Sequence, residues 1–140
     1  MVNLLECFND PMSKRETPLT RWYWSQVGGT LVEEFRLTGR TATSSARWVD
    51  GLILPNGPHR IAKAGEVSVD DQDVILVQTK KGRLGMYTMG QALFSKELME
   101  RNYSPRTVRS VALVEAYDDV LGPMLEAHEG LAVVVAPPDL

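Results

Sequence analysis

The segment Asp73–Gly85, DVILVQTKKGRLG, has the pattern that decides the fold. Its four consecutive aliphatic residues, Val74–Val77, predict a short strand that is covered on both faces of a sheet. The strand ends in Gln78, Thr79 and Lys80, and the pleat places Gln78 and Lys80 on the same side. Polar groups at the end of a buried strand are costly unless they are used. This strand end is therefore the first candidate for a functional site.

Length and composition indicate one soluble domain. The chain has 140 residues, of which 44% are hydrophobic and 24% charged, enough for a core of ordinary composition. The single cysteine, Cys7, cannot form an internal disulfide, which favours a reducing compartment. No apolar segment approaches the roughly 20 residues of a membrane span, and no signal-peptide pattern is present. We expect a cytoplasmic protein without membrane association, with an N-terminal arm at residues 1–16 and one domain at residues 17–140.

Charge is distributed unevenly along the chain. The net charge is −3, but residues 78–110 carry seven basic and two acidic side chains, a local +5. Residues 111–140 carry six acids and no Lys or Arg, a local −6. A basic surface can bind a polyanion although the whole protein is acidic. On charge alone, two solvated faces are the simpler interpretation, and both stay open.

The remaining patterns predict an α/β domain. The expected elements are a helix from Thr17-Pro18 to Val27, strands at Thr30–Leu37 and Ala46–Leu54, an optional short strand at Glu66–Val69, the strand Asp73–Lys80, a basic turn before a helix at Met86–Arg101, a strand at Val108–Glu115, a helix at Asp118–Glu129 and a strand at Leu131–Ala136. A continued helix is the competing interpretation of Thr30–Leu37. The order αβββαβαβ predicts a meander followed by β-α-β units, in a mixed sheet flanked by helices.

Asp50 is the second unusual polar residue, because Asp is disfavoured inside strands and costly to bury. Its neighbour Gly51 leaves backbone room of the kind found where a ligand approaches a strand. Oxygens from Asp50 and Gln78 suit Mg²⁺, and Lys80 could orient or deprotonate a water and stabilise a phosphate. The alternative is a structural Asp50–Lys80 salt bridge with Gln78 as a satisfied core amide. For Trp22, Trp24 and Trp48, core packing is the first interpretation and base stacking the second.

The sequences VDGLIL (49–54), VILVQTK (74–80) and KGRLGMYTMGQALFSKEL (81–98) resemble the PD-(D/E)XK nuclease superfamily, with the RecB-like and VRR-type branches nearest. The resemblance covers residues 17–136 in architecture, a restriction-endonuclease-like core, but its motif has only three residues. It matches the metal-binding Asp to Asp50, the usual Glu to Gln78 and the lysine to Lys80, a Q-x-K variant. Gln78 removes a negative charge, and Ser95 stands where RecB-like members carry Tyr four residues after a Gln, here Gln91.

Many members of this superfamily add a Glu from the first helix or the first strand. Glu16, Glu33 and Glu34 are the candidates here, and Glu34 is our choice. Glu66 could replace the lost carboxylate if its segment folds beside the third main strand.

The resemblance implies a nuclease that uses Mg²⁺ or Mn²⁺ to activate water for hydrolysis of DNA. Asp50 and Gln78 are then metal ligands, and Lys80 and Glu34 complete the catalytic set. The residues expected to contact nucleic acid are Lys81, Arg83, Gln91 and Lys96. The alternative is an inactive binding or assembly module of the same fold, as a homodimer or as a subunit of a larger complex.

Overall fold

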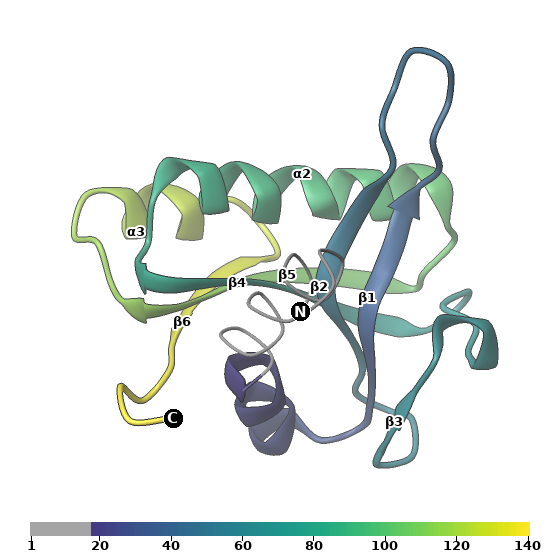
Figure 1. Ribbon diagram of the computed structural model, residues 1–140, viewed down its shortest axis with the longest axis horizontal. Coiled ribbons are helices and arrows are strands. Elements are labelled where there is room, and N and C mark those ends of the chain that lie inside the picture. Colours follow the sequence, from purple (N-terminus) through teal and green to yellow (C-terminus); the bar gives the residue numbers. More distant parts are fainter. Residues whose placement is uncertain (1–17) are drawn as a thin grey trace, which may run out of the picture.

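The computed structural model describes residues 18–140 and centres on a six-stranded mixed sheet in the order β3-β1-β2-β4-β5-β6 (Figure 1). The elements are a helix over residues 18–27, β1 (Thr30–Thr38), β2 (Arg47–Leu54), β3 (Arg60–Ala62), the 3₁₀ turn η1 (Ala64–Glu66), β4 (Asp73–Arg83), α2 (Met86–Asn102), β5 (Thr107–Ala116), α3 (Leu121–Glu126) and β6 (Leu131–Val135). The predicted class, a mixed sheet flanked by helices, is confirmed. The predicted arm and the Thr17 cap lie outside the described residues.

The sheet contains an antiparallel part, β1-β2-β4, and a parallel part, β4-β5-β6, that meet at β4, and the short edge strand β3 pairs parallel with β1. Strands β1, β2 and β4 pair antiparallel, whereas β4, β5 and β6 pair parallel. This is the predicted meander followed by β-α-β units, and pairing of β1 with β2 along its length excludes the helical alternative for Thr30–Leu37. Val74–Val77 are all buried, as expected of a central strand covered on both faces.

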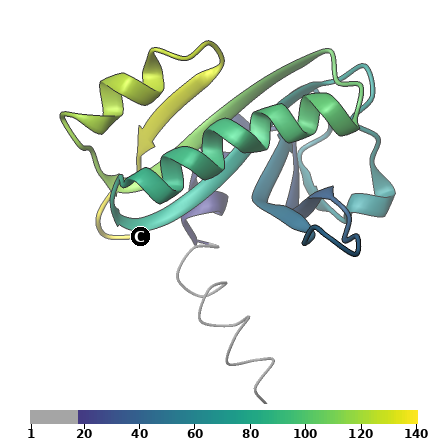
Figure 2. The same cartoon turned by 90° about the horizontal axis from the view of Figure 1, so that it is seen from above.

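Helices cover both faces of the sheet. The 18–27 helix packs on one face, and α2 lies lengthwise over β4 and β5 on the other, with α3 beside it (Figures 1 and 2). Alternation along the strands supplies both cores: Leu31 joins the cluster under the 18–27 helix, while Val32 joins the cluster that contains Met99 of α2. Burial of each such large aliphatic side chain contributes about 1.5–3 kcal/mol.

Gly51 serves helix packing rather than ligand approach. A methyl group on Gly51 would lie 2.8 Å from Cγ2 of Thr20 in the 18–27 helix. The space that was expected to admit a ligand is thus filled by that helix, so this part of the prediction is wrong. The absence of a side chain at Gly51 lets the helix approach the strand next to Asp50.

The expected strand at Glu66–Val69 is also wrong. The short strand is β3, which pairs parallel with the start of β1, and Glu66 lies in the turn η1 that follows it. The Oε1 atom of Glu66 accepts a hydrogen bond from the backbone of Lys63 at 2.8 Å. Because β3 is at the edge of the sheet beyond β1, Glu66 does not lie beside β4 and does not replace the missing carboxylate.

Two boundaries differ from the prediction. The expected basic turn continues as β4, since Arg83 pairs with Ala116 of β5 beyond an irregularity that contains Gly82 at φ 99°. The final helix is shorter than expected: Asp118 lies before it and accepts hydrogen bonds from the backbone of residues 120 and 121, and the helix ends at Glu126. Within residues 18–140, no helix is long and apolar enough to cross a membrane.

Candidate active site

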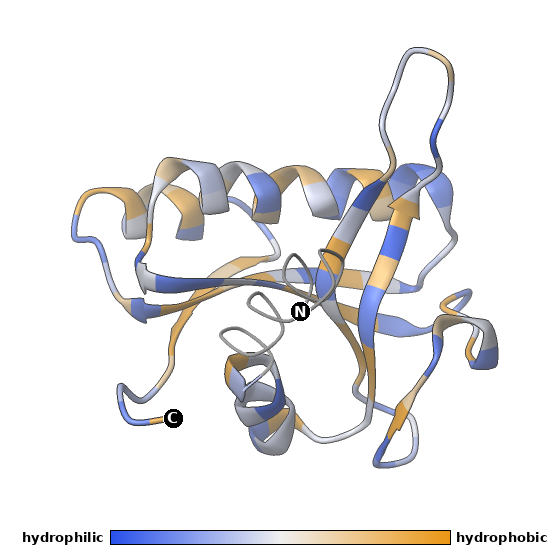
Figure 3. Ribbon diagram, viewed as in Figure 1, coloured by the Kyte–Doolittle hydropathy of each residue, from blue (hydrophilic) through white to orange (hydrophobic). Residues whose placement is uncertain are grey.

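The candidate site lies where β2 and β4 separate. The ladder between them joins Ile53 to Ile75, Leu52 to Leu76 and Gly51 to Val77, and it has no further pair in the described part of the chain. Asp50 and Gln78 are the next residues on the two strands. Figure 3 shows β4 changing from hydrophobic to hydrophilic towards the end that leads to α2. The separation of the strands thus places the predicted polar residues at one opening of the sheet.

The Asp50 carboxylate bridges this opening. Its Oδ2 atom accepts hydrogen bonds from the backbone N of Thr79 at 2.9 Å and from Oγ1 of Thr79 at 3.0 Å. Burial raises the pKa of Asp50, the two bonds from Thr79 oppose the shift, and the charge of Glu34 raises the pKa further. Asp50 is therefore an oriented carboxylate for which ionisation is costly in the described structure.

Glu34 faces Asp50 from the neighbouring strand in a strained conformation. Glu33 pairs with Gly51 and Phe35 with Val49, so Glu34 is the residue opposite Asp50. Its φ is 58°, in the left-handed region that costs a residue other than glycine about 1–2 kcal/mol. Such strain persists only where the surroundings hold it, and it is concentrated at functional sites.

The other described candidate, Glu33, has different partners from Glu34. The Glu33 carboxylate is bound by the guanidinium of Arg21, with Nε at 3.1 Å from Oε2 and Nη2 at 3.0 Å from Oε1. Glu33 thus joins β1 to the 18–27 helix, whereas Glu34 acts electrostatically on Asp50. Glu16 lies outside the described residues.

Gln78 is only 2% exposed and is held by α2. Its Nε2 atom donates a hydrogen bond to Oγ of Ser95 at 3.1 Å. The position that departs from the RecB-like pattern, Ser95, is therefore the residue that orients the amide, and Oε1 is left as the atom able to ligate a cation. Gln78, Ser95 and Gln91 line a groove of about 450 Å³ between β2 and α2.

Lys80 is exposed and aligned with Val114 in the β4–β5 ladder. Among residues 18–140, no ion pair includes Lys80, so the alternative of a structural Asp50–Lys80 salt bridge is wrong for this structure. The ammonium of Lys80 is instead available to an anion that approaches the end of β4.

The predicted nucleic-acid contacts do not form one cluster. Lys81 lies 3.8 Å from Glu115, Arg83 donates to the backbone carbonyl of Tyr117, and Lys96 forms an ion pair with Glu100 at 3.0 Å. Of the four, Gln91 shares a groove with Gln78.

The basic segment 78–110 is spread over the molecule. Arg106 binds Asp73 at the start of β4. Lys80 follows Asp73 by seven strand residues, which at about 3.3 Å per residue separate the two positions by roughly 23 Å. Arg101 pairs with Glu97 on α2. The local charge of +5 along the sequence is therefore not one surface in the fold.

The oxygen donors of the described residues are of the chemical type that binds a hard divalent cation. Among the described residues, no three His, Cys, Asp or Glu side chains lie close enough to hold a metal. The oxygen donors near this opening are the Asp50 carboxylate, the Glu34 carboxylate close enough to raise its pKa and, on the side of β4 that faces α2, the Gln78 carboxamide. Within residues 18–140, Oδ1 of Asp50 has no hydrogen-bond partner. Oxygen donors of this type suit Mg²⁺ or Mn²⁺, which retain several waters.

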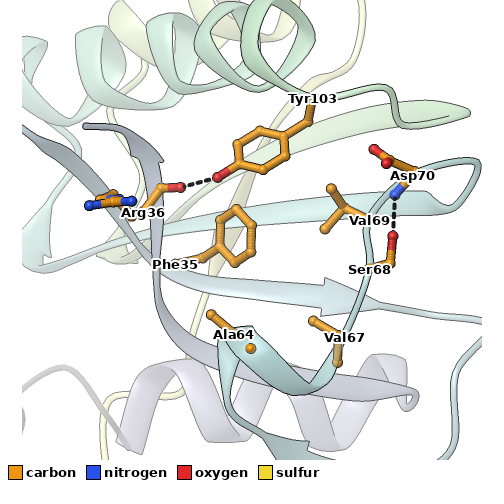
Figure 4. A pocket seen from close by; sticks show the side chains of 9 residues that line it. Phe35, Arg36, Ala64, Val67, Ser68, Val69, Asp70 and Tyr103 are labelled. Atoms are coloured by element: carbon orange, nitrogen blue, oxygen red, sulfur yellow. Dashed lines mark hydrogen bonds between the residues drawn. The ribbon is translucent and has the colours of Figure 1, made fainter.

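A second cavity, of about 380 Å³, lies between β1, the segment after η1 and the end of α2 (Figure 4). Tyr103 donates a hydrogen bond to the backbone carbonyl of Arg36 at 2.8 Å, and its ring lies against Phe35. None of the predicted site residues lines this cavity. It is a separate feature from the opening between β2 and β4.

The sequence interpretation missed two residues of the site. Thr79 holds Asp50 and Ser95 holds Gln78, yet both are buried polar residues of ordinary type. Ser95 was visible only as a departure from a family pattern. Thr79 could have been found from its position between Gln78 and Lys80, because the strand end was already suspected.

Comparison with known proteins supports the fold. No family model and no curated protein matches the sequence. Among solved structures, the crystal structure of a repair endonuclease from Pyrococcus abyssi matches with a TM-score of 0.55 and 14% sequence identity, over 90% of this chain and 47% of that chain. The chain has a restriction-endonuclease-like fold, as predicted. It spans about half the length of that endonuclease, and the likeness at this identity is one of fold.

Proposed function

We propose that the protein is a metal-dependent nuclease that hydrolyses phosphodiester bonds of DNA. The observation that carries the proposal is the strained Glu34 opposite Asp50, which brings two carboxylates to the point where β2 and β4 separate. The fold shared with a repair endonuclease supports it. A strained backbone conformation beside a second carboxylate is an arrangement that clusters at functional sites.

The residues of the site have distinct roles in this proposal. Asp50 and Gln78 would hold Mg²⁺ or Mn²⁺, with Glu34 adding negative charge; the bound ion would supply an activated water and neutralise the phosphate. Thr79 fixes the Asp50 carboxylate, and Ser95 orients the Gln78 amide. The ammonium of Lys80 would bind the scissile phosphate and orient the attacking water.

Cleavage of end-labelled DNA with Mg²⁺, Mn²⁺ or EDTA tests this proposal. We expect Asp50→Asn and Lys80→Ala each to lower the metal-dependent rate by about 10²-fold or more. Arg101→Ala is the matched control, because Arg101 is an exposed cation whose ion pair within residues 18–140 is with Glu97 on α2. Circular dichroism checks that all variants fold. Wild-type rates in both Asp50→Asn and Lys80→Ala would exclude this mechanism.

One observation favours the second candidate function, an inactive binding or assembly module. Gln78 is neutral, and its Nε2 atom is already bonded to Ser95 in the core. Calorimetric titration with Mn²⁺ separates the two: saturable binding that Asp50→Asn removes supports the nuclease, and no binding at millimolar metal supports the module. A measurement of solution mass tests the homodimer that the module implies.

A further inference from the structure

The groove beside Gln78 has an aromatic rim. Its walls include Arg47 and Trp48 of β2, Gln78 of β4, and Tyr87, Gln91 and Phe94 of α2. The volume of about 450 Å³ lies in the range of sites that bind small molecules, about 300–1,000 Å³. In Figure 1 the β1–β2 hairpin extends past the sheet towards α2, which brings the start of β2 to the helix.

The aromatic side chains of this rim are exposed to solvent. Trp48 is 56%, Tyr87 80% and Phe94 59% exposed. The expectation that Trp48 packs in the core is therefore wrong, although Trp22 and Trp24 do pack against the cluster under the 18–27 helix. Three exposed rings from two elements around one groove contribute little to the core, and exposed apolar patches of this kind mark binding sites.

The polar residues of the groove match the chemistry of a nucleobase. Aromatic rings stack on the faces of bases, and the carboxamide of Gln91 can donate to and accept from a base edge. Arg47 places a positive charge at the rim for the adjoining phosphate. Because Gln78 lines the groove and follows the last β2–β4 pair, the groove adjoins the strand position that neighbours Asp50.

We propose that this groove binds an unpaired nucleobase of the substrate strand, so that the site takes single-stranded or locally unpaired DNA in preference to duplex. The inference rests on the proposed function and specifies its substrate. A base inside a duplex has both faces stacked and its edge paired, so it cannot enter an aromatic groove without leaving the helix. A base in a single strand pays no such cost.

A protein partner is the competing occupant. Met86 of this groove also lines a neighbouring cavity of about 250 Å³ between α2 and α3, together with Met89, Leu93 and Met124. That cavity is largely apolar and suits a protein side chain. The groove beside Gln78 differs from it by its guanidinium, its two carboxamides and its three aromatic rings, which favour a base.

Binding measured in EDTA, where metal-dependent cleavage is absent, tests the inference. Fluorescence anisotropy would compare a labelled single strand, a duplex of equal length and an abasic strand that has the phosphates but no bases. We expect wild-type protein to bind the single strand about 10-fold more tightly than the other two. Trp48→Ala and Tyr87→Ala should each weaken single-strand binding about 10-fold and leave abasic-strand binding unchanged. Met124→Ala is the matched control, since Met124 is also 56% exposed but lines the apolar cavity.

The outcomes separate this inference from the proposed function. Unchanged affinities in Trp48→Ala and Tyr87→Ala, or equal losses for single and abasic strands, would overturn the base-binding groove even if wild-type protein cleaves DNA with Mg²⁺. The expected binding pattern without any Asp50-dependent cleavage would leave the groove standing and overturn the nuclease. Loss of binding in Met124→Ala equal to that in Trp48→Ala would favour a general apolar docking surface and overturn the groove's specificity for bases.

Discussion

Two aspartates lie along β4 in opposite environments: Asp73 begins the strand, and Asp50 of the neighbouring β2 is hydrogen-bonded to Thr79 towards its other end. Asp73, at the start of the strand, accepts hydrogen bonds from Nε and Nη2 of Arg106, from Oγ1 of Thr107 at 2.6 Å and from Nδ2 of Asn56 at 2.9 Å. These bonds, with Arg106 first, hold the pKa of Asp73 well below its usual range. Asp50, near the other end, is bonded only by Thr79 among the described residues, and burial beside Glu34 raises its pKa.

Under the proposed function, Asp73 is a structural acid and Asp50 is the acid that binds the metal. The bonds that Asp73 accepts tie the start of β4 to β5 and to the turn after β2, and they satisfy its charge. Among the described residues, one oxygen of Asp50 has no hydrogen-bond partner and Glu34 adds a like charge nearby, so the ionised form of Asp50 is costly. An incoming cation would remove that cost, so the unfavourable end of β4 is the one that can bind.

The largest effect that sharpens this contrast is expected at Glu34. Glu34→Gly should lower metal-dependent cleavage about 10²-fold, because the second carboxylate is lost, and should raise the stability by about 1 kcal/mol, because glycine accepts the positive φ. Chemical denaturation and single-turnover cleavage measure the two quantities.

Glu33→Gly is its matched control on the same strand. It removes the bonds to Arg21 and places a glycine in an ordinary strand position, so it should lower stability by about 0.5–1 kcal/mol. Cleavage by Glu33→Gly should stay close to wild type. A loss of stability in Glu34→Gly equal to that in Glu33→Gly would mean that residue 34 is not strained.

A smaller effect separates the two aspartates by stability alone. Asp50→Asn keeps an oxygen that can accept from Thr79 and removes the cost of the buried charge, so it should raise stability at pH 7 by about 1 kcal/mol, as often occurs when a functional site is relieved. Asp73→Asn removes the ion pair with Arg106 and should lower the melting temperature. Calorimetry on both variants measures the effects, and shifts of the same sign would contradict the contrast.

The smallest effect is in the pH dependence. Because the pKa of Asp73 is lower in the folded chain, its contribution is present above about pH 4, the unfolded value, and is lost as the pH falls further. Because the pKa of Asp50 is raised, its ionisation lowers stability as the pH rises from about 4 through the folded value. Denaturation curves between pH 2 and 7 should therefore give a flatter acid limb for Asp73→Asn. An acid limb unchanged from wild type would exclude this role of Asp73.

Much of the architecture could be predicted from local pattern. Four adjacent aliphatic residues at Val74–Val77 have few stable environments other than a covered strand, and all four are buried. Asp50 and Gln78 could be singled out because burial of a polar group in or at the end of a strand costs free energy. Their registration at neighbouring strand positions agrees with that reasoning.

The errors arose where contacts distant in sequence decide the outcome. Residues 66–69 have the composition of a strand, but the edge of β1 is occupied by Arg60–Ala62. Gly51 appeared to make room for a ligand until the 18–27 helix filled the space, and Trp48 was assigned to the core although it lies at the groove. The composition of a segment does not reveal which distant segment will pack against it.

The order of the elements, the central strand β4 and the polar residues at its end follow from local pattern, because burial cost and periodicity act over a few neighbouring residues. Which carboxylate lies near Asp50, which side chains hold Asp50, and where the basic residues lie depend on tertiary contacts. Those features depend on strand register and helix packing between segments far apart in the chain. The positive φ of Glu34 is the clearest case, since the residues on both sides of it pair with β2 and Phe35 packs in the core.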